Sequence, residues 1–141
     1  MVVEVFDGSG GNGKNYHTKM VVAPDGLPAM PRMQAKIRFN QRLWNSGQIN
    51  ADSQRAGISG VAFVNALLDN VAQRTSVDKN RIYATGHSNG AGMTFKIGAE
   101  LSSRFFGIAT VVGMNTTEGA HPTKALSALM LIRMRCPLNP I

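Results

Sequence analysis

The sequence predicts an α/β fold in which a mostly parallel sheet carries helices on both faces. A helical period of apolar residues over positions 61–74 stands between short β-branched runs that are typical of strands. The run at 105–112, FFGIATVV, is apolar on both of its alternating faces, as in a strand buried within a parallel sheet. Strand and helix therefore alternate through the middle of the chain, and we expect a single α/β domain over residues 1–141.

The first elements are expected close to the N-terminus. Val2–Phe6 is an apolar, β-branched run that predicts a strand, and it gives way to a glycine-rich stretch at 7–13. A second strand is expected at 19–23, before the turn signal Pro24-Asp25-Gly26. Residues 27–59 hold prolines and scattered charges without a sustained period, which predicts a long loop.

The later elements follow from residue spacing. Apolar residues over 61–71 recur three and four positions apart, so they occupy one face of a helix. The β-prone run at 81–85 predicts a strand, and a second helix is expected at 90–101. Residues 126–134 predict a last strand that is interrupted by Arg133.

Composition and charge narrow the classes of partner. The 141 residues carry a formal net charge of +7, which is spread along the chain. A nucleic-acid site would need a basic stripe with interleaved aromatic residues, so we expect no nucleic-acid partner. No apolar stretch approaches the roughly 18 residues of a membrane span, and we expect no membrane insertion. The single cysteine, Cys136, excludes an internal disulfide and a multi-thiolate metal cluster.

The strongest chemical signal is Gly86-His87-Ser88-Asn89-Gly90, a G-x-S-x-G pattern between a predicted strand and a predicted helix. In this context the serine stands on a sharp turn, and its hydroxyl is raised above the sheet edge at a helix N-terminus. We therefore predict Ser88 as a nucleophile, with the N–H of Asn89 stabilising the oxyanion. The alternative interpretation is a chance pentapeptide in a glycine-rich chain.

The glycine-rich loop at 8–13 follows the first predicted strand, so it is expected at the carboxyl edge of the sheet, where such sheets place ligands. There the backbone of Gly10 and Gly11 would supply a second oxyanion donor. A plain turn and a phosphate-binding loop are the alternatives. The phosphate-loop pattern is not met, because position 15 is Asn rather than Ser or Thr, although Lys14 follows Gly13.

The stretch from Gly57 to Gly113, above all NRIYATGHSNGAGMTFKIGAELSSRFFGIATVVG, resembles the polyhydroxybutyrate depolymerase and feruloyl esterase-like family of α/β-hydrolases. GSGGNG at 8–13, VVAPDGL at 21–27 and Trp44-Asn45 fit the same family in the same order. The resemblance implies an α/β-hydrolase-like sheet and a Ser-His-Asp triad without a metal or an organic cofactor. It implies hydrolysis of carboxylic esters, such as short hydroxyalkanoates or aromatic esters. It also implies an extracellular location, although the N-terminus lacks the features of a signal peptide.

The chain departs from this family in its first βα unit and in the triad. Asp7-Gly8 stands where the family has His-Gly, and only residues 14–20 lie between the glycine loop and Val21, too few for the family's usual helix. Cys136 occupies the position of the triad acid, and no histidine follows it. We therefore expect an α/β-hydrolase-like domain that is shortened and incomplete at its C-terminus.

The remaining histidines are candidates for the other site roles. His121 follows the run at 105–112, in a loop expected at the same edge of the sheet as Ser88, so it is the candidate general base. His87 adjoins Ser88, but adjacent side chains diverge, which argues against a direct hydrogen bond. We predict instead that His87 and Trp44 contact the substrate.

Two classes of function follow from these observations. The first is a serine carboxylic-ester hydrolase in which Ser88 attacks the ester carbonyl. The second is a catalytically impaired fragment or degenerate copy that acts at most as a binding or interaction module, because the triad acid and base are not identified. An apolar sheet edge would favour a homo-oligomer, and a base supplied across such an interface is a third interpretation.

Overall fold

The computed structural model describes the second half of the chain most fully. The described residues are 1–6, 28–29, 35–36, 42–47, 57, 59–113, 115 and 121–132. The predicted strand at 19–23 and the glycine-rich loop at 8–13, with Gly10 and Gly11, lie outside the described residues, as does Cys136.

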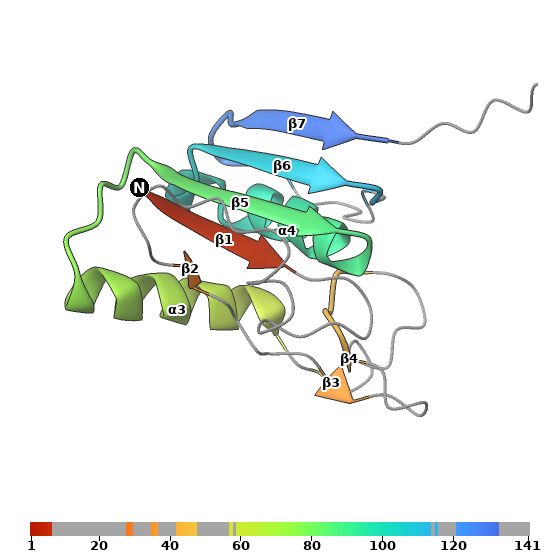
Figure 1. Cartoon of the computed structure of the whole chain (residues 1–141), viewed down its shortest axis with the longest axis horizontal. Helices are drawn as coiled ribbons and strands as arrows, with labels where there is room; N and C mark the ends of the chain where they lie inside the picture. Colours follow the sequence, from red (N-terminus) through yellow and green to blue (C-terminus); the bar gives the residue numbers. More distant parts are fainter. Residues whose placement is uncertain are drawn as a thin grey trace, which may run out of the picture.

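A wholly parallel five-stranded sheet forms the centre of the described structure (Figure 1). Its spatial order is β2-β1-β5-β6-β7, and each neighbouring pair is parallel. The strands are β1 Val2–Phe6, β2 Pro28–Ala29, β5 Ile82–His87, β6 Gly107–Val111 and β7 Ser127–Leu131. This pairing confirms the predicted parallel sheet, and it brings the carboxyl ends of the strands to one edge.

The segment 27–59 was predicted to be a long loop, and that prediction is wrong at three short strands. β2 joins the main sheet, while β3 Ala35–Lys36 and β4 Arg42–Leu43 form a separate antiparallel pair. Each of these strands has two residues, which is too short to show the alternation of side chains by which a strand is recognised in a sequence. Their existence depends on the partner strand rather than on a local pattern.

Two helices cover one face of the sheet (Figure 1). α3 Gly60–Arg74 begins at the N-cap Ser59, whose Oγ accepts a hydrogen bond from the Ala62 N–H at 3.1 Å. α4 Asn89–Glu100 packs against β5, β6 and β1, and the short 3₁₀ helix η1 Ser102–Arg104 follows it. Both α-helices agree with the predicted ranges to within one residue at each end. Within the described ranges, no helix has the length and apolar character needed to cross a membrane.

The core lies between the two helices and the sheet face that they cover. Its buried side chains include Phe6, Val64, Leu68, Ile82, Met93, Ile97, Phe105 and Ile108. Residues of the opposite sheet face, such as Val3, Tyr83 and Thr85, are half-buried. The described residues thus confirm helices on one face and include none on the other.

β7 forms one edge of the sheet, and all five of its residues are exposed. Leu129, Met130 and Leu131 are 45–58% exposed, and Ile132 after them is 61% exposed. An apolar strand with an open edge is a template for pairing with another chain. The expected apolar edge is therefore present, and self-association through it stays a prediction.

Candidate active site

The G-x-S-x-G pattern forms a sharp turn from strand to helix. β5 ends at His87, α4 begins at Asn89, and Ser88 between them has φ 55° and ψ −119°. A non-glycine residue at positive φ is strained and persists only where the surrounding structure enforces it. One enforcing contact is the hydrogen bond from the Ser88 N–H to the Val111 carbonyl oxygen at the end of β6, at 3.0 Å.

Two glycines allow the chain to close around this turn. A Cβ at Gly86 would lie 2.3 Å from the Gly90 carbonyl oxygen, closer than real Cβ atoms approach backbone. A Cβ at Gly113 would lie 2.2 Å from the Cβ of Ala91, on the first turn of α4. Gly86 belongs to the predicted motif. Gly113 was not assigned a role from the sequence, although its place just after a buried strand is a usable signal for close approach.

The first turn of α4 faces the same edge of the sheet as Ser88. The N–H groups of Ala91 and Gly92 donate to the Ser88 carbonyl oxygen at 3.0 and 3.2 Å. Asn89 is the first helical residue, so its N–H has no intrahelical acceptor. A free N–H at the positive end of a helix dipole is suited to an anionic group.

The side chain of Asn89 is buried, at 3% exposed, and bonds to a distant segment. Its Oδ1 accepts from the Trp44 N–H at 2.6 Å. Its Nδ2 donates to the Trp44 carbonyl oxygen at 3.3 Å and to Ser46 Oγ at 3.2 Å. The sequence pattern indicates a role only for the backbone of Asn89, because hydrogen-bond partners more than 40 positions away leave no local signal.

Comparisons with known proteins bear on the identity of this arrangement. No protein-family model matches the chain. Over 99 residues the chain is 28% identical to a protein of Nocardia uniformis subsp. tsuyamanensis named "Putative esterase NocK". The match covers 69% of this chain and 29% of that protein. This similarity supports an esterase-like relationship.

Two solved structures share the architecture. A Bacillus cereus carboxylesterase has a TM-score of 0.57 and 18% identity, covering 86% of this chain and 57% of its own. A structure titled "Structure of YahD with Malic acid" has a TM-score of 0.57 and 15% identity, covering 82% of this chain and 59% of its own. The chain has the α/β-hydrolase fold. The predicted fold class is thereby confirmed, and the chain spans less than two thirds of each of these three proteins.

In this fold, the structure places His121 at the opposite sheet edge from Ser88. β6 and β7 are parallel, so the chain between them must return to the amino edge before β7 begins. The Thr123 N–H donates to Oγ of Ser102, which precedes β6, at 2.9 Å. His121 is two residues from Thr123, within about 7 Å, whereas the six residues of β5 separate Ser88 from that edge by about 20 Å.

The expectation that His121 shares an edge with Ser88 is therefore wrong. The physical reason is the return crossover that two parallel strands require, which carries the chain to the opposite edge. This location does not support a hydrogen bond between His121 and Ser88 within one chain, and the role of His121 as base stays a prediction.

The two predicted substrate contacts lie in different environments. Trp44 is 1% exposed, and its ring packs edge-on against Phe6 with centroids 5.1 Å apart. Such a ring belongs to the core, so this geometry does not support a substrate contact for Trp44. His87 is half-buried at the end of β5, paired in register with Val111. Its substrate contact stays a prediction.

Glu4 is a buried acid that the sequence reasoning did not single out. It lies in the middle of β1 between Ala29 and Ala84, and it is 0% exposed. Within the described part of the chain, neither carboxylate oxygen has a hydrogen-bond partner. Burial raises the pKa of Glu4 to about 8, and the attraction of Arg104 opposes this rise. The signal available in the sequence was an acid within an apolar strand.

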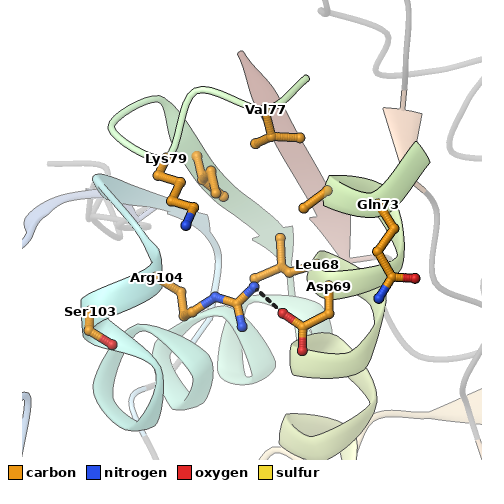
Figure 2. Close-up of a pocket in the computed structure, with 9 residues that line it drawn as sticks. Leu68, Asp69, Gln73, Val77, Lys79, Ser103 and Arg104 are labelled. Atoms are coloured by element: carbon orange, nitrogen blue, oxygen red, sulfur yellow. Dashed lines mark hydrogen bonds and ion pairs between the residues drawn. The ribbon is translucent and has the colours of Figure 1, made fainter. Parts of the chain in front are cut away.

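A cavity of about 610 Å³ is lined by residues of α3, of η1 and of the start of β5 (Figure 2). Figure 2 shows Arg104 of η1 directed at Asp69 of α3, with Nη2 and Oδ1 2.7 Å apart. Ile82, the first residue of β5, also lines the cavity, which places it toward the amino edge of the sheet. The cavity is therefore separate from the candidate active site. Among the described residues, no group of three His, Cys, Asp or Glu side chains is arranged to hold a metal.

Proposed function

We propose that this chain is the nucleophile-bearing part of a serine carboxylic-ester hydrolase, with Ser88 as the nucleophile. The observation that carries the proposal is the positive φ of Ser88 between the end of β5 and the N-terminus of α4. Strained backbone of this kind concentrates at functional sites. The similarity to a protein named as an esterase and to a solved carboxylesterase supports the same reaction class.

In the proposed reaction, Ser88 Oγ attacks the carbonyl carbon of the ester, and the π electrons of the carbonyl bond move to its oxygen. The Asn89 N–H at the positive end of α4 stabilises this oxyanion, together with a donor from the loop at 8–13. Collapse breaks the bond to the alcohol, which leaves with the proton from the serine, and the acyl group stays on Ser88. Water then attacks the acyl-serine and releases the acid.

A general base would accept the proton of Ser88 Oγ during this attack. His121 lies at the opposite edge, and no other described histidine except His87, adjacent to Ser88, is near the turn. Without a base, only oxyanion stabilisation and binding remain, and these give a small part of the rate of a complete triad. We therefore expect slow hydrolysis by the isolated chain, and faster hydrolysis wherever a second copy or another segment supplies the base.

The finer assignment rests on the resemblance to polyhydroxybutyrate depolymerases and feruloyl esterases. The substrates proposed on this ground are esters of short hydroxyalkanoates or of aromatic acids, and the proposed location is extracellular. The alternative function is a non-catalytic binding or interaction module. The observation that favours it is the apolar, exposed strand β7, combined with a Ser88 turn to which the described residues contribute no assigned base.

Hydrolysis of a short-chain nitrophenyl ester tests the proposal. The unmodified chain should release nitrophenol faster than Ser88→Ala, because that variant removes only the nucleophilic oxygen. Ser103→Ala is the matched control, since Ser103 is an exposed serine on η1, away from the turn, and it should hydrolyse at the unmodified rate. Equal rates for the unmodified chain and Ser88→Ala would remove the esterase and leave the binding module.

A further inference from the structure

The side chain of Asn89 makes contacts that the proposed backbone role of this residue does not require. Its amide pairs with both the N–H and the carbonyl oxygen of Trp44, and its Nδ2 also reaches Ser46 Oγ. Asn89 is 3% exposed, Trp44 1% and Ser46 0%. The amide therefore satisfies the polar backbone of Trp44 as a neighbouring strand would, and all of these groups are out of reach of bulk water.

Trp44 has a second anchor through its ring. The ring meets Phe6 edge-on, with an interplanar angle of 79°, and Phe6 is the last residue of β1. In the sequence, Phe6 is followed by Asp7 and then by the glycine-rich segment 8–13, which is proposed to supply the second oxyanion donor. Trp44 therefore contacts Asn89, whose N–H is one proposed oxyanion donor. It also contacts Phe6, which precedes the segment proposed to supply the second donor.

We infer that Asn89, Trp44 and Ser46 form a clamp that holds the first turn of α4 in the orientation needed for oxyanion binding. Asn89 is then a positioning residue through its side chain, besides donating through its N–H. This inference rests on the proposed function. The clamp matters because a donor that moves by about 1 Å can reduce a reaction rate about a hundredfold.

Asparagine is matched to this place by its chemistry. An amide offers an acceptor to the Trp44 N–H and two donors for the Trp44 carbonyl and Ser46 Oγ. Aspartate has nearly the same shape but only accepts, so it would leave these two oxygens facing a carboxylate. Alanine removes the side-chain bonds without adding charge, which makes Asn89→Ala the clearer test of positioning.

The experiment measures the rate at which a fluorophosphonate labels Ser88, followed by mass spectrometry. The label forms a bond between Ser88 Oγ and phosphorus and releases fluoride. The labelling rate therefore reports the reactivity of Ser88 and the stabilisation of the oxyanion, and it does not depend on hydrolysis of an acyl-serine. A second readout is the fluorescence of Trp44, the single tryptophan of the chain. Asn65→Ala is the matched control, because Asn65 lies on α3, away from the turn, and accepts a hydrogen bond from Arg104 of η1.

Asn89→Ala should label about a hundredfold more slowly under conditions where it is folded, and its Trp44 emission should shift to longer wavelength. Asn65→Ala should keep both the labelling rate and the emission of the unmodified chain. Ser46→Ala removes one of the three hydrogen bonds and should label about threefold more slowly. If Asn89→Ala does not fold, the labelling rate of Ser46→Ala is the measurement that tests the clamp.

Different results would overturn different parts of the reasoning. Labelling of Asn89→Ala at the unmodified rate with shifted emission would make the clamp structural only. An unmodified rate with unshifted emission would show that Trp44 is held by other contacts. If the unmodified chain does not label more than Ser88→Ala, the proposed function fails and the positioning role fails with it. A shift of the Trp44 emission in Asn89→Ala would then still show the contact between Asn89 and Trp44.

Discussion

Replacing Glu4 by glutamine is expected to stabilise the protein at neutral pH and to remove part of its pH dependence. The carboxyl group is fully buried, has no hydrogen-bond partner among the described residues, and has its pKa raised by burial from 4.5 to about 8. Glutamine has nearly the same shape as glutamate, and because it carries no charge, its burial removes no charged group from water. The expected gain in stability arises because Glu4 of the unmodified protein ionises in the unfolded chain at neutral pH, which favours unfolding, whereas glutamine does not ionise.

The direction and size follow from linkage. Between pH 4.5 and about 8, the unfolded chain has released the Glu4 proton while the folded chain retains it. The unfolded state then binds fewer protons, so the free energy of unfolding falls as pH rises, by about 1.4 kcal/mol per pH unit. The loss is about 3 kcal/mol at pH 7 and about 5 kcal/mol above pH 8, and it is absent below pH 4.5.

Urea denaturation at several pH values between 4.5 and 8.5, followed by Trp44 fluorescence, measures this effect. The difference in unfolding free energy between Glu4→Gln and the unmodified chain should grow with pH across this window and then level off. Glu100→Gln is the control, because Glu100 is an exposed acid paired with Lys96, and its curve should parallel that of the unmodified chain. A difference that stays constant from pH 5 to 8 would refute an ionisable buried Glu4.

Three further substitutions test contacts that hold the fold together. Gly86→Ala should destabilise by about 3 kcal/mol in urea denaturation, because its Cβ would meet backbone at the Ser88 turn; an unchanged midpoint would contradict this close approach. Ser59→Ala should cost about 1 kcal/mol by losing the cap to the Ala62 N–H, whereas Ser59→Asp should retain most of the stability. Ser102→Ala should cost about 1–2 kcal/mol and speed amide exchange at Thr123, whose N–H loses its acceptor; unchanged exchange there would argue against this contact.

Most elements of the described fold were accessible from the sequence because their signals are local. The apolar spacing over 61–71 and the β-branched runs of β1 and β5 are properties of neighbouring residues, and they agree with the observed helix and strands. The strand-turn-helix context of Ser88 is equally local. The prediction of a continuous loop over 27–59 is wrong at β2, β3 and β4, since a two-residue strand exists only through its partner.

By itself, then, the sequence determined the α/β class, the helices and the position of Ser88 on a turn between strand and helix. Only the tertiary structure decided that His121 lies at the opposite edge, that Asn89 pairs with Trp44 at a separation of 45 positions, and that Glu4 is buried without a hydrogen-bond partner among the described residues. The physical reason is the same in each case. Strand order and core packing decide which distant segments meet and which groups lose water, and neither depends on residues that are neighbours in the chain.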